Sequence, residues 1–289
     1  VAGFAATVPG AVVGELARLP GVRAVTPDGR VRVQAAAPGS STIRSVYPKV
    51  VRADAAWRGG VTGRGVTVAV LDTGVAPTVP DLAGRLVQVT DDPTGRTAPC
   101  KNLSGELDCN DRYGHGTFIA GLVAGNGAGS GGRWKGVAPE ASILSVKAAG
   151  ADGSADVSNI LAAIQWVVSF KERYNIRVLN LSLGTDSTQD WQVDPLNYAV
   201  ERAWAAGMTV VVAASNNGPD PRTITKPADD PWVVTVGATD DRGTATLGDD
   251  QLPDFSGRGP TAHGVAKPDV VAPGAHVISL RAPGSTIDT

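Results

Sequence analysis

Two β-prone runs, each followed by polar residues, constrain the fold of this chain more than any other feature. Residues 66–71 read Val-Thr-Val-Ala-Val-Leu and precede Asp72. Residues 209–214 read Thr-Val-Val-Val-Ala-Ala and precede Ser215 and Asn216. Unbroken runs of this kind are typical of strands buried on both faces, which occur in parallel sheets covered by helices. We therefore predict an α/β fold with a mainly parallel central sheet.

Helical patterns alternate with the strand patterns along the chain. Residues 143–147 are predicted to form a strand, and residues 156–174 carry apolar side chains at helical spacing. A second helix is predicted over residues 194–206, with Gly207 as its C-cap. This strand–helix order predicts helices on both faces of the sheet.

Candidate catalytic side chains lie at the ends of these patterns. Open α/β sheets place their chemistry beyond the carboxyl ends of the strands, where Asp72 and Asn216 are expected. A turn residue is the alternative for each of the two positions. His115, between Gly114 and Gly116, opens an apolar helix pattern and has an ordinary pKa suited to proton transfer. A buried structural histidine is the alternative for this position.

Composition excludes several classes of protein. The 26 basic and 28 acidic residues give a net charge of −2, so we expect no nucleic-acid partner. No apolar stretch is long enough to span a membrane, and we expect no membrane partner. The Gly-x-Gly-x-x-Gly pattern at residues 127–132 follows a predicted helix rather than a strand, so it does not indicate a dinucleotide site.

The two cysteines, Cys100 and Cys109, lie in a polar segment predicted to be a surface loop. In an exported protein, two cysteines favour one local disulfide, and free thiols are the alternative. A zinc site would need further cysteine or histidine ligands.

Six motifs in order resemble the subtilisin-like serine peptidases, or subtilases. The resemblance spans roughly residues 46–285 and implies a three-layer αβα fold. Ser215 departs from the pattern, because glycine is usual there. The motifs are Leu-Asp-Thr-Gly-Val at 71–75, Gly-His-Gly-Thr-Phe-Ile-Ala-Gly at 114–121, the segments 146–154 and 178–184, Ala-Ala-Ser-Asn-Asn-Gly at 213–218, and Lys-Pro-Asp-Val-Val-Ala-Pro-Gly at 267–274.

The resemblance implies a secreted, monomeric serine endopeptidase that needs no cofactor for its chemistry. Asp72 would orient His115, His115 would exchange a proton with a serine hydroxyl, and Asn216 would donate to the oxyanion. Protein or peptide substrates would lie extended between two short segments. Their residues are Gly153, Ser154 and Ala155 on one side and Ser182, Leu183 and Gly184 on the other.

The resemblance also divides the chain. Residues 1–37 are similar to the second half of an inhibitory α+β propeptide, which in this family acts as an intramolecular inhibitor with its tail in the substrate cleft. An ordinary αβ cap is the alternative. Within this unit we predict a strand at residues 4–8 and another at 31–33. Residues 38–289 would form the catalytic domain, and the linker at 35–41 is a candidate processing site.

The nucleophile motif of the family, Gly-Thr-Ser-Met-Ala, does not occur before Thr289. Ser285 lies in a Gly-Ser-Thr sequence with the wrong order. We therefore expect the catalytic domain to be incomplete at its C-terminus, with the serine beyond Thr289, and these 289 residues to be inactive. The alternative function is a non-catalytic peptide-binding relative.

Calcium is a candidate structural ion, because many subtilases bind it. Asp81 matches a position that often ligates calcium, and carbonyls of residues 126–132 would complete the site. A simple turn residue is the alternative for Asp81.

Overall fold

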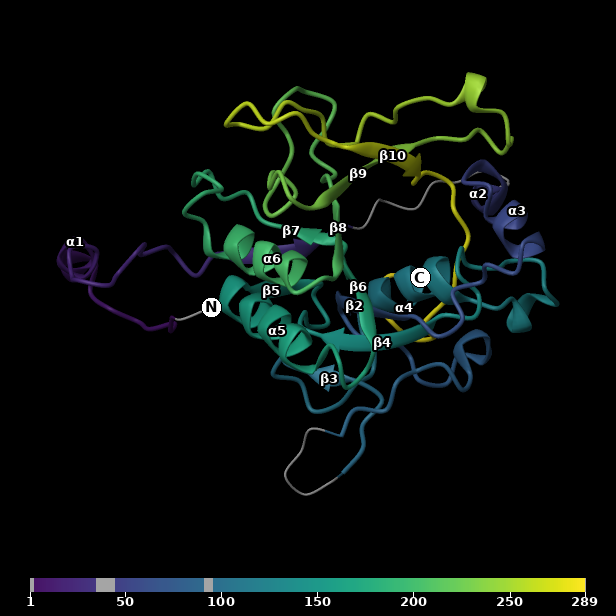
Figure 1. The fold of residues 1–289 in the computed structure, drawn as a ribbon, viewed down its shortest axis with the longest axis horizontal. Helices are drawn as coiled ribbons and strands as arrows, with labels where there is room; N and C mark the ends of the chain where they lie inside the picture. Colours follow the sequence, from purple (N-terminus) through teal and green to yellow (C-terminus); the bar gives the residue numbers. More distant parts are fainter. Residues whose placement is uncertain (1–2, 35–44, 91–95, 289) are drawn as a thin grey trace.

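The computed structural model describes residues 3–34, 45–90 and 96–288, and a seven-stranded sheet lies at its centre (Figure 1). The strand order is β10-β9-β8-β6-β2-β4-β3, and every neighbouring pair is parallel. The predicted mainly parallel sheet is therefore confirmed. Its strands are β2 (Thr67–Asp72), β3 (Lys101–Asn102), β4 (Ser142–Lys147), β6 (Ile176–Leu181), β8 (Thr209–Ala213), β9 (Val234–Thr239) and β10 (Val270–Pro273).

Strand β2 lies between β4 and β6, and all six of its residues are buried. Successive side chains of a strand point to opposite faces, so a central strand serves two cores. Val68 and Val70 pack in the smaller core, whereas Ala69 and Leu71 pack in the larger one. The unbroken apolar run in the sequence is the consequence of this double burial.

Helices cover both faces of the sheet. α5 (Val157–Phe170) and α6 (Pro195–Ala205) pack in the larger core, and α4 (His115–Ala124) packs in the smaller one on the other face (Figure 1). The start of α6 is fixed by Asp194, whose carboxylate accepts the backbone N–H groups of Leu196 and Asn197. Within the described ranges, no helix is long and apolar enough to cross a bilayer.

Short helices and 3₁₀ turns complete the described chain. They are α1 (Val13–Leu16), α2 (Tyr47–Val50), α3 (Ala53–Arg58), η1 (Gly10–Val12), η2 (Pro80–Leu82), η3 (Ala128–Ser130) and η4 (Leu247–Asp249).

A second, three-stranded sheet brings the N-terminal segment onto the body of the protein. β1 (Arg30–Val33) lies antiparallel between β5 (Ser154–Asp156) and β7 (Leu183–Gly184). The side chains of β1 alternate between exposed arginine and buried valine. The part of the segment before β1, including α1, extends away from the body (Figure 1). Residues 4–8 form no strand and are exposed, because no neighbouring strand pairs with them.

Candidate active site

Asp72 and His115 meet at the boundary between the sheet and α4. Asp72 is the last residue of β2, and His115 is the first residue of α4. The Nδ1 atom of His115 lies 2.8 Å from Oδ1 and 2.9 Å from Oδ2 of Asp72. Asp72 is fully buried, and His115 is 4% exposed. Because a carboxylate only accepts hydrogen bonds, this geometry assigns the proton to Nδ1 and leaves Nε2 for chemistry.

Opposing effects act on the pKa of His115. Burial lowers this pKa, whereas the charge and hydrogen bond of Asp72 raise it, with help from the Gln34 backbone and the charge of Asp111. The net effect is a pKa above the usual histidine value. The Asp72 carboxylate therefore favours the imidazolium form, which is what a general base needs once it has taken a proton.

Asp111 fixes the start of the helix that carries His115. Its Oδ1 accepts the backbone N–H of Gly114 at 2.7 Å. Its Oδ2 accepts the backbone N–H and the hydroxyl of Thr117 at 2.8 and 2.7 Å. Asp111 thus satisfies donors at a helix N-terminus, where backbone N–H groups lack partners within the helix.

Thr73 joins this capping arrangement to β2. Its hydroxyl donates to Asp111 at 2.8 Å and accepts the backbone N–H of Gly116 at 3.0 Å. Gly116 must be glycine, because a Cβ there would lie 2.0 Å from the carbonyl oxygen of Gly74. The sequence predicted no role for Asp111 or Thr73. An aspartate shortly before a predicted helix start was the available signal.

Asn216 follows β8 and lies next to Gln34, the residue that follows β1. Its backbone N–H donates to the side-chain Oε1 of Gln34 at 2.9 Å. The preceding Ser215 has φ of 138°, in the region that favours glycine, which accounts for the usual glycine there. The hydroxyl of Ser215 donates to the carbonyl of Thr223 at 2.5 Å.

Gln34 shows that the distant segments converge on one place. Its backbone lies close enough to His115 to raise the pKa of the imidazole, and its side chain accepts the backbone N–H of Asn216. Its own backbone N–H donates to the carbonyl of Ser182 at 2.9 Å. Gln34 therefore lies beside both His115 and Asn216, and Asp72 is bonded to the Nδ1 atom of the same histidine.

The six predicted substrate-binding residues line a groove that β1 occupies. Val31 lies opposite Ala155, and Arg32 lies opposite Ser154 and Gly184. Leu183 lies opposite Val33. The remaining two residues accept backbone hydrogen bonds, Gly153 from the N–H of Val33 at 3.0 Å and Ser182 from Gln34. The groove thus binds an extended peptide through main-chain hydrogen bonds on both sides.

Ser285 lies near the candidate site without joining it. It is buried, and a Cβ on Gly114 would lie 2.5 Å from its hydroxyl oxygen. That hydroxyl has no hydrogen-bond partner in the described part of the chain. The Gly-Ser-Thr sequence is therefore close to His115 but is not bonded to it.

Asp81 does not lie in a site that fits calcium. Its Oδ2 accepts the backbone N–H of Gly129 at 2.8 Å. The guanidinium of Arg85 donates to the carbonyls of Asp81, Ala124 and Ala141, which are the kind of ligands that calcium uses. No cluster of three or more acidic, histidine or cysteine side chains that could hold a metal occurs among the described residues. The Arg85 guanidinium therefore lies against these three carbonyls, and the Asp81 carboxylate is already engaged by a backbone N–H.

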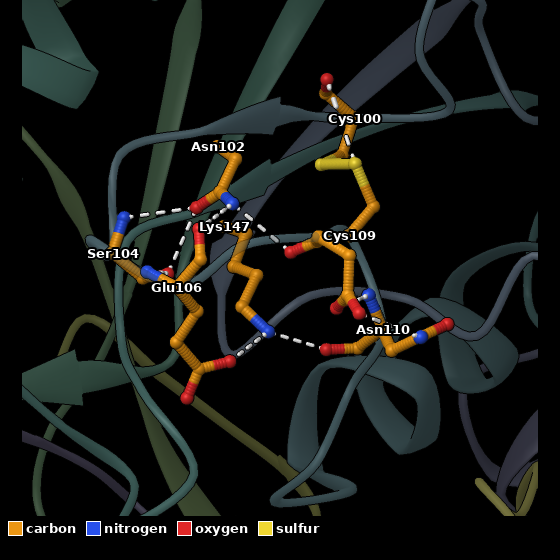
Figure 2. The surroundings of a disulfide bond; sticks show 8 residues. Cys100, Asn102, Ser104, Glu106, Cys109, Asn110 and Lys147 are labelled. Carbon is orange, nitrogen blue, oxygen red and sulfur yellow. Dashed lines mark hydrogen bonds and ion pairs between the residues drawn. A yellow bond between two sulfur atoms is a disulfide. The ribbon is translucent and has the colours of Figure 1, made fainter.

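Cys100 and Cys109 form a disulfide in the structure, with their Cα atoms 5.7 Å apart (Figure 2). It closes the loop between β3 and the segment that leads to Asp111. This loop lies beside the candidate site and close to the groove.

Comparisons with known proteins agree with this geometry. The sequence profile of the subtilase family matches residues 63–289. Serine protease AprX of Bacillus subtilis is 45% identical over 233 residues, which cover 79% of this chain and 50% of AprX. Subtilisin Savinase of Lederbergia lenta is 37% identical over 238 residues, covering 82% of this chain and 73% of Savinase. The solved structure of the S41 psychrophilic protease has a TM-score of 0.64 at 33% identity, over 78% of this chain and 71% of that one. The chain spans half the length of AprX.

We predict that Asp111→Ala lowers the free energy of unfolding by about 2–4 kcal/mol, because it leaves the buried donors of Gly114 and Thr117 unpaired. Denaturant unfolding of the purified chain measures this change. Asp108→Ala is the matched control, because Asp108 is a half-buried neighbour on the surface loop, and its loss should shift the unfolding midpoint much less than that of Asp111. Equal midpoints for wild type and Asp111→Ala would contradict this role of Asp111.

We also predict that the melting temperature is the same in a chelator and in millimolar calcium. Arg85→Met should lower the free energy of unfolding by about 1–3 kcal/mol, because three carbonyls lose their donor. Thermal and denaturant unfolding test both statements, with the exposed Arg133→Met beside the same loop as control. A lower melting temperature in the chelator would show that calcium does bind.

Proposed function

Because the chain belongs to the subtilase family, we propose that it carries the catalytic site of a serine endopeptidase that cleaves extended protein substrates. One observation carries this proposal. A strand of the chain itself, β1, lies in the groove between β5 and β7, and its C-terminal neighbour Gln34 reaches His115. A substrate bound in the same way would present a peptide bond to the histidine.

The described residues would divide the chemistry as follows. Asp72 holds the Nδ1–H of His115, so that Nε2 takes the proton from a serine hydroxyl as the serine oxygen attacks the peptide carbonyl. Asn216 donates to the oxyanion of the tetrahedral intermediate. His115 then gives the proton to the leaving amine as the C–N bond breaks, and water hydrolyses the acyl-enzyme. None of these steps needs a metal or a cofactor.

We do not assign the serine to a described residue. Ser285 makes no hydrogen bond to His115, and no other described hydroxyl is bonded to the ring. We therefore expect the polypeptide of residues 1–289 to be inactive by itself. The nucleophile would come from outside the described residues.

The groove favours substrates by backbone shape more than by side chain. Main-chain hydrogen bonds tolerate many sequences, which suits cleavage of unfolded protein. Val31 and Val33 are buried in the groove, so apolar side chains are favoured at those two positions. Arg30 lies 3.0 Å from Asp156, but both side chains are exposed and such pairs contribute little.

We infer that the segment up to about residue 37 is an intramolecular inhibitor. Its β1 strand lies in the groove, and the side-chain Oε1 of Gln34 accepts the backbone N–H of Asn216. We propose that processing takes place behind Gln34, because Gln34 is the last described residue seated in the groove. The candidate linker at residues 35–41 lies outside the described residues. The disulfide supports a secreted protein, because such bonds persist in oxidising compartments.

The first test is hydrolysis by the full-length gene product. We expect it to cleave a fluorogenic peptide, to be blocked by a serine-directed phosphonate, and to lose activity as pH falls through the raised pKa of His115. His115→Ala should lower kcat by roughly a millionfold, a figure borrowed from subtilisin. The exposed His263→Ala should remain active. Full activity in His115→Ala would refute the proposal, and phosphonate labelling of residues 1–289 alone would refute the inactivity of that polypeptide.

The second test concerns the N-terminal segment. A synthetic peptide of residues 22–34 should inhibit competitively a full-length protein from which residues 1–34 have been removed. Val31→Asp in that peptide should weaken inhibition by about tenfold or more, because a buried apolar side chain is replaced by a charge. The exposed Arg32→Ala should have little effect. Non-competitive inhibition, or equal inhibition by the Val31→Asp peptide, would contradict the assignment.

A further inference from the structure

The disulfide loop, residues 100–109, has its own internal scaffold (Figure 2). The side-chain amide of Asn102 donates to the carbonyls of Glu106 and Asp108 at 2.8 and 2.9 Å. The Oδ1 of Asn102 accepts the backbone N–H and the hydroxyl of Ser104. The disulfide and Asn102 together fix the backbone of this short loop, and with it the place of Glu106.

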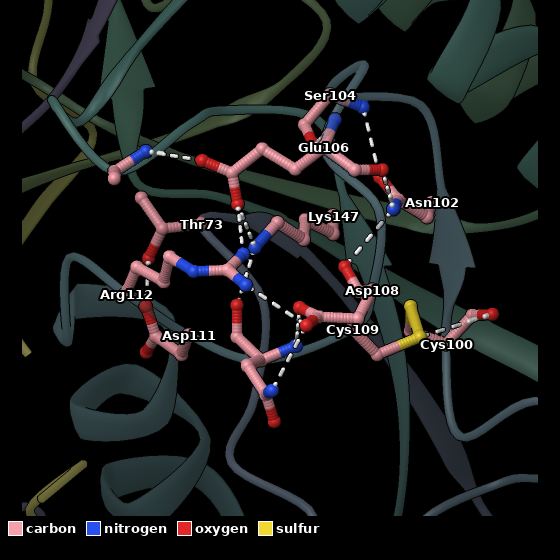
Figure 3. A network of polar contacts seen from close by, with 12 residues as sticks. Thr73, Cys100, Asn102, Ser104, Glu106, Asp108, Cys109, Asp111, Arg112 and Lys147 are labelled. Carbon is pink, nitrogen blue, oxygen red and sulfur yellow. Dashed lines mark hydrogen bonds and ion pairs between the residues drawn. A yellow bond between two sulfur atoms is a disulfide. The ribbon is translucent and has the colours of Figure 1, made fainter.

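Glu106 points from this loop into a network of three partners (Figure 3). Its Oε2 lies 2.7 Å from the Nζ of Lys147 and 2.9 Å from Nη1 of Arg112. Its Oε1 accepts the backbone N–H of Ala151 at 2.9 Å. Burial raises the pKa of Glu106, but Lys147, Ala151 and Arg112 lower it, and the pKa lies below its usual value. The carboxylate is therefore ionised at neutral pH.

Ala151 belongs to the turn that leads into β5 and the groove. The turn is closed by hydrogen bonds from Gly150 N–H to Ser154 O and from Gly153 N–H to Gly150 O, each 3.0 Å long. Gly153 has φ of 70°, and a Cβ there would lie 2.8 Å from the ring of Tyr113. The carbonyl of Gly153 accepts the N–H of Val33 in β1. One short turn therefore separates the Glu106 carboxylate from the peptide in the groove.

We propose that Glu106 is a positioning residue of the peptide groove, which holds the turn at residues 150–153 so that Gly153 can accept the backbone of a bound peptide. The proposal rests on the proposed function for the identity of the groove as a substrate site. Among the residues that the structure describes, Glu106 makes no hydrogen bond or ion pair with Asp72 or His115, so its influence should fall on peptide binding and not on proton transfer.

The test compares two substitutions, of which one keeps a hydrogen-bond acceptor at this position and the other does not. Glu106→Ala and Glu106→Gln both remove the carboxylate charge, but only glutamine keeps an acceptor for the Ala151 N–H and for Arg112. Because Lys147 is fully buried, each substitution is made in a Lys147→Met background, which leaves no buried ammonium unpaired. Asp108→Asn, on the same loop, is the surface control.

The readout is amide hydrogen exchange by residues 30–34 in the polypeptide of residues 1–289, which needs no catalysis. Relative to the background, we expect exchange at residues 30–34 to be about five- to tenfold faster with alanine, as for one lost hydrogen bond, and nearly unchanged with glutamine. Equal exchange in the two variants would overturn the proposal. An equal loss of protection across α4 would also overturn it, because the effect would then be general loosening.

Kinetics of the full-length gene product give an independent readout. Glu106→Ala should raise KM by about five- to tenfold while kcat and the pH profile of kcat stay as in Glu106→Gln. A fall in kcat without a change in KM would count against the proposal. If exchange responds as expected but the full-length protein hydrolyses no peptide, the proposed function fails and the role of Glu106 in holding the groove stands.

Discussion

The contact between the Asp72 carboxylate and the His115 ring is the interaction on which the rest of the structure depends. It joins the end of the central strand to the start of a helix on one face of the sheet, and both side chains are buried. A buried carboxylate needs a full set of partners. Asp72 has them in His115 and in the backbone N–H of Thr73, which donates to its Oδ1 at 2.8 Å. The second buried acid, Asp111, then holds the helix in the position that this contact requires.

The sequence was most informative where burial is repeated along a segment. The run at residues 66–71 predicted β2 to within one residue at each end. A strand buried on both faces has apolar residues at nearly every position, so its pattern in the sequence is unbroken. The strands β5 and β7 were not predictable as strands. They have three and two residues, and each pairs with β1, so their conformation depends on a distant segment. The strand predicted at residues 4–8 is absent for the same reason, since it has no partner.

The residues of the candidate site divide in the same way, into those predictable from local sequence and those that depend on distant segments. Asp72, His115 and Asn216 were found because their motifs are local in sequence. Asp111 was missed because its role appears only when the chain turns and its carboxylate reaches the helix start. Glu106 gave no local signal either, because its three partners are Lys147, Arg112 and a backbone N–H in the turn before β5. The surroundings of Asp81 likewise depend on a distant segment, because its carboxylate accepts the backbone N–H of Gly129.

The covalent connection of β1 to the rest of the chain determines when β1 would leave the groove. A tethered segment experiences an effective local concentration in the millimolar range, whereas a freed one is diluted into the surrounding solution. The hydrogen bonds that seat β1 involve residues up to Gln34, so a cut behind Gln34 would leave them in place. Release would therefore follow from the lost tether alone, with no change in the groove, and it would become permanent once the departing segment is itself degraded.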